Sequence, residues 1–171
     1  MSTEMPWVSE ETKKAIEHRE NIAKNQDFEG LFNLKDNDDF NIALFEILAN
    51  KCDYNPSKLN SIQRNLFICM LLENSSQSDM ILNFLQEDYP EYKIEVISAL
   101  NEIGATKSAE IIKKAITLIP KDNTWFYDAV DENSKETMNK LDSEFSNYPD
   151  GKLNILYRIY SERHKKEIQT I

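Results

Sequence analysis

The pattern of apolar and polar residues predicts helices along almost the whole chain. The clearest case is the segment 91–120, where apolar residues recur every three or four positions in two successive runs. The principal apolar positions of the two runs are Ile94, Ile97, Leu100, Ile112, Ile116 and Ile119. Such a stripe marks the face of a helix that is buried against other elements. The segment therefore predicts two helices, each with one buried side.

A defined break separates these two runs. Gly104 follows the last periodic residue of the first run, where a glycine can adopt the left-handed conformation that closes a helix. Thr106 suits the N-cap of the second helix, and Pro120 ends that helix because proline lacks a backbone N–H. The segment is therefore predicted to be a tight helical hairpin.

Other segments show the same spacing. Ser9 suits an N-cap for a first helix with a thin apolar face, and the segment 27–37 is predicted to connect it to the rest. Further helices are expected over 38–52, 58–73, 80–85, 131–147 and 152–168. We therefore expect an all-α, single compact domain of about seven or eight helices, built as stacked helical hairpins. Residues 1–35 should form a peripheral helix and connector, and residues 36–171 the core.

One apolar run is ambiguous when taken alone. Residues 66–72 are uninterrupted by polar side chains, which also fits a buried strand. Leu59 and Ile62 extend the pattern at helical spacing, and no turn precedes Leu66. Only three glycines and five prolines occur in 171 residues, so the residues that β-turns need are scarce. We therefore predict a helix here.

Composition also limits the cellular context. The N-terminal residues lack the basic and apolar regions of an export signal, and no window approaches the length of a membrane span. These features favour a cytoplasmic protein. Cys52 and Cys69 have no cysteine or histidine neighbours, so two reduced, partly buried thiols are expected rather than a metal site or a disulfide.

The sequence lacks the residues that most kinds of catalytic chemistry require. The three glycines stand too far apart to form a phosphate-binding loop, and the two histidines match no metal or nucleophile motif. Asp36, Asp38 and Asp39 could suggest a calcium loop, but helix capping is the better interpretation, since the glycine and the distal glutamate are missing. We predict no enzyme, no cofactor and no metal. An enzyme that uses two carboxylates in a helical cleft is the least favoured alternative.

The distribution of charge is more informative than the net charge of −10. Residues 73–103 contain one base and seven acids, residues 122–150 two bases and eight acids, and residues 104–121 between them four bases and one acid. At helical spacing, acids should form rows along exposed faces. We predict a partner-binding surface from eight of these acids: Glu87, Asp88, Glu91, Glu95, Asp128, Asp131, Glu132 and Glu136. A merely solvated acidic surface is the alternative.

The segment Ser98–Pro120, with its Ala-Leu, Ile-Gly-Ala and Ala-Glu-Ile elements, resembles a bacterial family of domains of unknown function whose best-known member is a DNA mimic protein. The resemblance extends more weakly from about Asp38 to about Ile159. Relatives carry an Asn-Gly-Gly-aromatic-x-Gln motif that residues 77–82 do not preserve, so no site residue is taken from it. The resemblance implies an acidic helical protein, often a homodimer, that binds a transcription regulator in place of DNA.

Acidic composition argues against direct binding of nucleic acid and permits a basic protein partner. A basic DNA-binding protein is therefore the expected partner. An immunity or antitoxin-like protein that binds one toxin remains the alternative. The adjacent aromatics Trp125, Phe126 and Tyr127 are expected to cover the open end of the core, with an exposed interface anchor as the other possibility.

Overall fold

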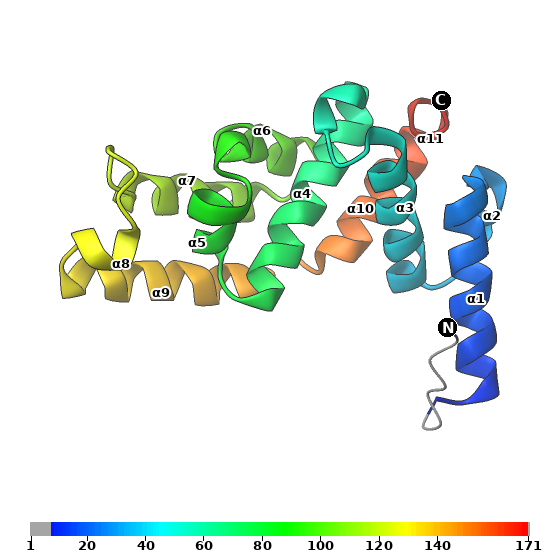
Figure 1. Cartoon of the computed structure of the whole chain (residues 1–171), viewed down its shortest axis with the longest axis horizontal. Coiled ribbons are helices and arrows are strands. Elements are labelled where there is room, and N and C mark those ends of the chain that lie inside the picture. The colour runs from blue at the N-terminus through cyan, green and yellow to red at the C-terminus, as the bar shows by residue number, and fades with distance from the viewer. Residues whose placement is uncertain (1–7, 171) are drawn as a thin grey trace.

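The computed structural model describes residues 8–170 and shows an all-α protein (Figure 1). The α-helices of this part of the chain are α1 (Glu10–Asn25), α2 (Phe28–Asn33), α3 (Asn37–Cys52), α4 (Ser61–Ser78), α5 (Ile81–Asn83), α6 (Glu95–Glu102), α7 (Thr106–Leu118), α8 (Phe126–Ala129), α9 (Glu132–Ser146), α10 (Leu153–Arg163) and α11 (Lys165–Ile168). The expected fold class is confirmed. The number of helices exceeds seven or eight because α2, α5, α8 and α11 are short helices within segments predicted as connectors or as parts of longer helices.

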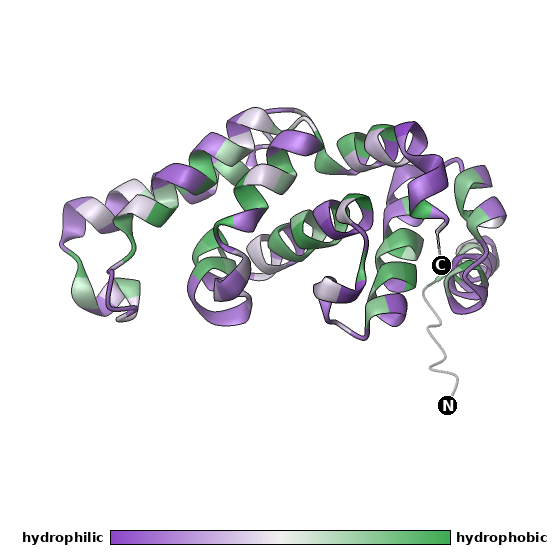
Figure 2. Ribbon diagram, turned by 90° about the horizontal axis from the view of Figure 1, so that it is seen from above, coloured by the Kyte–Doolittle hydropathy of each residue, from purple (hydrophilic) through white to green (hydrophobic). Residues whose placement is uncertain are grey.

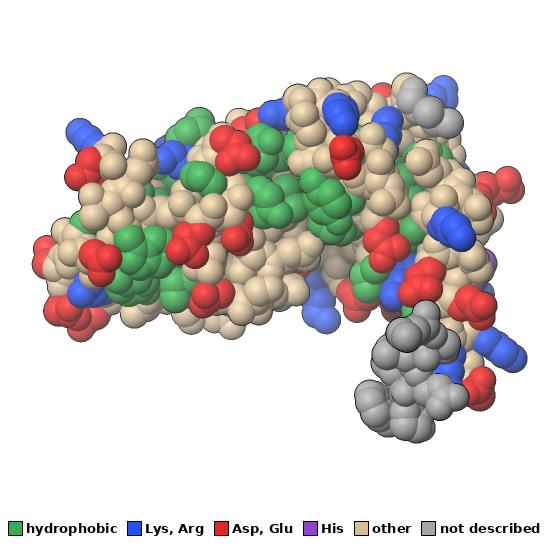
Figure 3. Space-filling view, in the orientation of Figure 1, with side chains coloured by type: hydrophobic (Ala, Val, Ile, Leu, Met, Phe, Trp, Pro, Cys, Tyr) green, Lys and Arg blue, Asp and Glu red, His purple; other side chains and the backbone are tan. Residues whose placement is uncertain are grey.

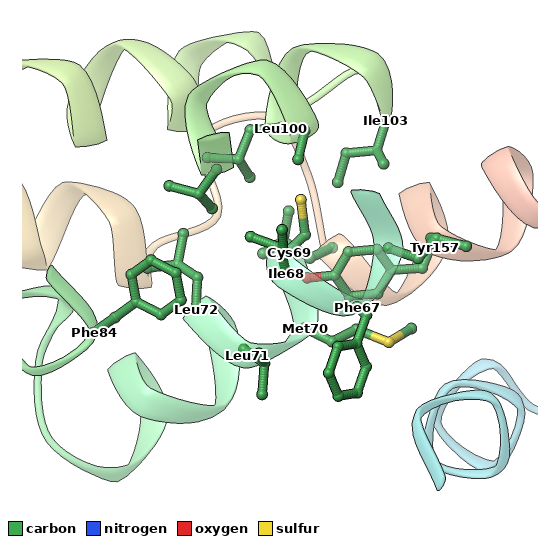
Figure 4. Packing of buried hydrophobic residues seen from close by; sticks show 14 of the residues in the cluster. Phe67, Ile68, Cys69, Met70, Leu71, Leu72, Phe84, Leu100, Ile103 and Tyr157 are labelled. Carbon is green, nitrogen blue, oxygen red and sulfur yellow. The ribbon is translucent and has the colours of Figure 1, made fainter. Parts of the chain in front are cut away.

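The helix α4 lies at the centre of the core. Every residue from Leu66 to Leu72 is buried, so the ambiguous apolar run is a helix surrounded on all sides (Figure 4). The predicted end of this helix at residue 73 is wrong, because α4 continues to Ser78. The hydroxyl of Ser76 donates to the carbonyl of Glu73, and Ser78 donates to Asn74, both at 2.9 Å. These bonds satisfy the serines inside the helix.

The hairpin is confirmed at its turn and corrected at its start. Gly104 has a φ of +92°, the left-handed conformation that closes α6. The segment Pro90–Tyr92, however, forms a single 3₁₀ turn, and α6 begins only at Glu95. Ile94 is consequently 63% exposed and does not belong to the buried face, contrary to the prediction.

The cap of α7 also differs from the prediction. Thr106 is the first residue of α7 rather than its N-cap, and the preceding Ala105 offers no side-chain acceptor. The carboxylate of Asp150 accepts from the N–H groups of Lys107 at 3.0 Å and Ser108 at 2.7 Å. A residue more than forty positions away therefore caps this helix.

Local capping was predicted correctly elsewhere. The Ser9 hydroxyl accepts from Thr12 N–H at 3.1 Å at the start of α1. Asp36 accepts from the N–H groups of Asp38 and Asp39, which confirms helix capping for the aspartate cluster.

Both cysteines are reduced and fully buried. Among the described residues, no group of side chains is arranged to hold a metal ion.

The helices are stacked along the molecule. The pair α1 and α2 packs against α3 at one end, whereas α4, α6, α7 and α9 follow one another toward the other end (Figure 1). The chain then returns through α10, which packs against α3. Seen from above, the apolar sides of the helices face inward and polar residues line the outside (Figure 2). No helix of residues 8–170 is long and apolar enough to cross a membrane.

The last predicted helix is split. The segment expected to be continuous over 152–168 contains α10 and α11, which are separated at His164. Ile155 and Ile159 do not anchor this helix, since they are 44% and 48% exposed. Leu153, Tyr157 and Tyr160 hold α10 to the core instead.

Candidate partner-binding surface

The two acidic segments, 73–103 and 122–150, meet in space at the α8 end of the molecule. Gln86 joins them, since its side chain accepts from the N–H of Phe126 and donates to the carbonyl of Thr124, both at 3.0 Å. A second contact runs from Lys93 to Asn123 at 3.5 Å. Figure 3 shows several acidic side chains gathered over the α8 and α9 end. Residues about forty positions apart are therefore combined on one part of the surface.

Seven of the eight predicted acids are exposed to solvent. They are Glu87, Asp88, Glu91, Asp128, Asp131, Glu132 and Glu136. The eighth, Glu95, is half-buried, and both of its carboxylate oxygens accept hydrogen bonds from Arg64, at 2.5 and 2.7 Å. This pairing raises the pKa of Arg64, chiefly through the hydrogen bond with Glu95. The charge of Glu95 is thus already neutralised within the chain.

Three of the exposed acids also have local roles. Asp131 accepts from the N–H of Ser134 at 2.8 Å as the N-cap of α9, and this bond lowers the pKa of Asp131. Asp88 accepts from the hydroxyl of Ser75 at 2.8 Å. Glu132 forms a salt bridge of 2.8 Å with Lys135. The remaining four, Glu87, Glu91, Asp128 and Glu136, have no side-chain partner within the described residues.

The acids do not form the long helical rows that their spacing predicts. Glu91 lies in the 3₁₀ turn, whereas Glu95 begins α6. Asp128 belongs to α8 and Glu132 to α9, so only Glu132 and Glu136 continue along one helix. The prediction of long rows is wrong, because short turns interrupt the helices at Pro90 and at Val130.

The basic segment 104–121 lies between the acidic elements. It contains α7, which packs against both α6 and α9. Its outward residues include Lys107, Lys113 and Lys114, all exposed. Two acidic surfaces consequently flank a basic helix, and one place where they join is the end where Gln86 reaches Phe126.

Several acids in these segments are structural, which the sequence does not reveal. Asp142 accepts from the N–H of Ile81 at 2.8 Å, and Asp150 caps α7. Their donors lie about 40 to 60 positions away, so local spacing carries no signal for them. No aspartate or glutamate among residues 8–170 is fully buried.

The adjacent aromatics mainly cover the core, as expected. Phe126 is buried, and Trp125 and Tyr127 are half-buried against the hydrophobic cluster. The Tyr127 hydroxyl hydrogen-bonds to Asn139 on α9 at 2.8 Å. This contact fixes α8 onto α9 and sets the position of Asp128.

Comparison with known proteins bears on this surface. A family model described as "DMP19-like protein" matches residues 57–164, which run from just before α4 to the end of α10 and include all eight predicted acids. No curated protein and no solved structure matches the chain. The family match covers more than half of the 171 residues and confirms the resemblance in the hairpin segment. The chain belongs to the DMP19-like protein family.

Proposed function

We propose that this protein is a non-enzymatic DNA mimic that occupies the DNA-binding surface of a basic transcription regulator. The exposed acids at the α8 end carry the proposal, because four of them have no side-chain partner among residues 8–170 and remain available to a partner protein. They are Glu87, Glu91, Asp128 and Glu136. Asp88, Asp131 and Glu132 add to the same negative field, whereas Glu95 contributes least because Arg64 neutralises it.

Electrostatics explain how such a surface would act. Duplex DNA presents closely spaced negative charges, and proteins that bind it gain much of their affinity from ionic contacts. Complementary charge also speeds association and suppresses wrong partners. The family name and the acidity of the two segments support this function over simple solubility.

A pull-down from the lysate of the source cell, eluted with a salt gradient and repeated with excess duplex DNA, tests the proposal. We expect a DNA-binding protein that salt releases and DNA displaces. The triple variant Glu87→Lys, Glu91→Lys and Glu136→Lys should abolish capture, because exposed ionic contacts provide the attraction. These positions avoid the helix caps, so folding should be retained.

A matched control uses acids at the opposite end of the molecule. Glu17, Glu20 and Glu29 are exposed on α1 and α2, and reversing all three changes the net charge by the same amount. This variant should still capture the partner, whether or not reversing Glu17 and Glu20 on α1 disrupts the homodimer proposed below. Equal loss in both triple variants would indicate a general charge effect. Capture of one partner indifferent to DNA would replace the proposal with an immunity or scaffold function.

We also propose a homodimer. The first helix buries only Ile22 and Ala23 among its residues and exposes Ala15, so most of its surface is free of contacts with the described chain. A second copy could cover this helix. Mass measurement in solution at micromolar concentration should give twice the mass of the 20.0 kDa chain, and a monomer would contradict the proposal.

A further inference from the structure

A cleft of about 670 Å³ lies outside the acidic surface, between α3, α4 and the start of α10. Its volume falls within the rough range of 300–1,000 Å³ typical of small-ligand sites. Four aromatic residues line it: Phe45, Tyr54, Tyr148 and Tyr157. Three acids, Asp38, Glu46 and Glu73, face one base, Lys152. The cleft is thus both aromatic and predominantly negative.

Glu73 is the most enclosed acid of this cleft. Its carboxylate accepts from the hydroxyl of Tyr148 at 3.0 Å and from the amide of Gln77 at 3.3 Å. Burial raises the pKa of Glu73, against the opposite effect of the hydrogen bond from the Tyr148 hydroxyl. No base among residues 8–170 forms a salt bridge with it. The negative charge therefore lacks a counter-ion.

Polar groups in the walls also lack partners. The amide oxygens of Asn41 and Asn154 and the hydroxyl of Tyr157 are buried without a hydrogen bond to any described residue. The amide nitrogens are already used, since Asn41 donates to the carbonyl of Asn154 and Asn154 donates to Asp38. The unpaired amide atoms are therefore acceptors. An unpaired buried acceptor is unfavourable, so a donor group from a ligand would be favoured here.

We propose that this cleft binds an alkylguanidinium group, with the Glu73 carboxylate as its counter-ion. A guanidinium is flat, stacks on aromatic rings and offers five N–H donors, which matches a site with aromatic walls and several free acceptors. It is also less strongly hydrated than an ammonium, so its desolvation is easier. The group belongs either to a free small molecule or to an arginine side chain of a polypeptide.

Titration calorimetry of the full chain with N-butylguanidinium tests this site. We expect saturable binding of one equivalent, and binding of the neutral isostere N-butylurea should be at least about tenfold weaker, because it cannot pair with the carboxylate. N-acetylarginine methylamide distinguishes the two sources. If it also binds, the ligand is an arginine of a polypeptide, and if only the free cation binds, the ligand is a small molecule.

Glu73→Gln is the decisive variant. It keeps the shape and the oxygen that accepts from Tyr148, yet binding of N-butylguanidinium should weaken at least about thirtyfold. Glu144→Gln on α9 removes the same charge from an exposed position outside the cleft and should leave binding within about twofold. Equal loss in both variants would overturn the proposal.

Amide chemical shifts provide a check that does not depend on a variant. N-butylguanidinium should perturb residues of α3, α4 and the start of α10, and leave α9 unchanged. Perturbation confined to the α8 and α9 end, absence of saturable binding at millimolar concentrations, or equal binding of N-butylurea would each overturn the proposal. A site of this kind is independent of the acidic surface, so loss of partner capture in the triple variant would not affect it.

Discussion

The acidic surface at the α8 end and the cleft around Glu73 use the same functional group in opposite surroundings. At the α8 end, Glu87 and Glu136 are exposed to solvent and have no side-chain partner in the described part of the chain. In the cleft, Glu73 is largely enclosed and hydrogen-bonded to Tyr148. As proposed, the first region would act through many charges, whereas the second would act through one charge in a fixed place. The comparison shows that a count of acids does not by itself indicate how each one functions.

Solvent screening explains the difference. At physiological salt, exposed charges more than about 8–10 Å apart hardly influence one another, so the α8 end needs several acids together to attract a partner. An enclosed carboxylate is screened much less, and one cation of the right shape can pair with it. Salt should therefore weaken capture at the acidic surface far more than guanidinium binding in the cleft.

Asp150 extends the comparison to an enclosed acid whose carboxylate already accepts hydrogen bonds from groups within the chain. Asp150→Ala would remove bonds to the N–H groups of Lys107 and Ser108 and to the Ser108 hydroxyl. We expect a loss of about 2 kcal/mol in the free energy of unfolding, the largest effect among these variants, because the start of α7 would be left uncapped. Denaturant unfolding measures this loss. An unchanged stability would show that water replaces the carboxylate.

Glu73→Gln tests the other region of the comparison, the cleft with its enclosed acid. Burial raises the pKa of Glu73, so the folded state disfavours its charged form. Wild-type stability should fall as the pH rises from the ordinary glutamate pKa through this raised pKa. The variant does not titrate, so at neutral pH it should melt a few degrees higher than the wild type. Below the ordinary glutamate pKa the two should melt together, and a variant that is less stable at neutral pH would contradict the argument.

The helices were largely predictable from sequence because each carries its own apolar spacing. The positions Met138, Leu141 and Phe145, for example, are the buried residues of α9. The roles of Glu95, Asp142 and Asp150 were not predictable, because their partners come from distant segments. Arg64 reaches Glu95, and Asp150 reaches the start of α7, from about 30 to 43 positions away. Local spacing predicts which side of a helix an acid occupies, but not which residues the acid contacts there.

Asp131→Ala is expected to give the smallest change in stability, with a sign opposite to that of Glu73→Gln. The backbone N–H of Ser134 lowers the pKa of Asp131, so its charged form stabilises the folded state. That contribution is fully present above the ordinary aspartate pKa and is lost as the pH falls through the lowered one. The variant should therefore be less stable than the wild type at neutral pH, with the difference shrinking in acid, and thermal melts across this pH range measure it.

Opposite signs for Asp131 and Glu73 at neutral pH would show that the solvated acids support the fold, whereas the enclosed acid of the cleft opposes it until a cation binds. The same sign in both variants would mean that the two regions do not differ in this way.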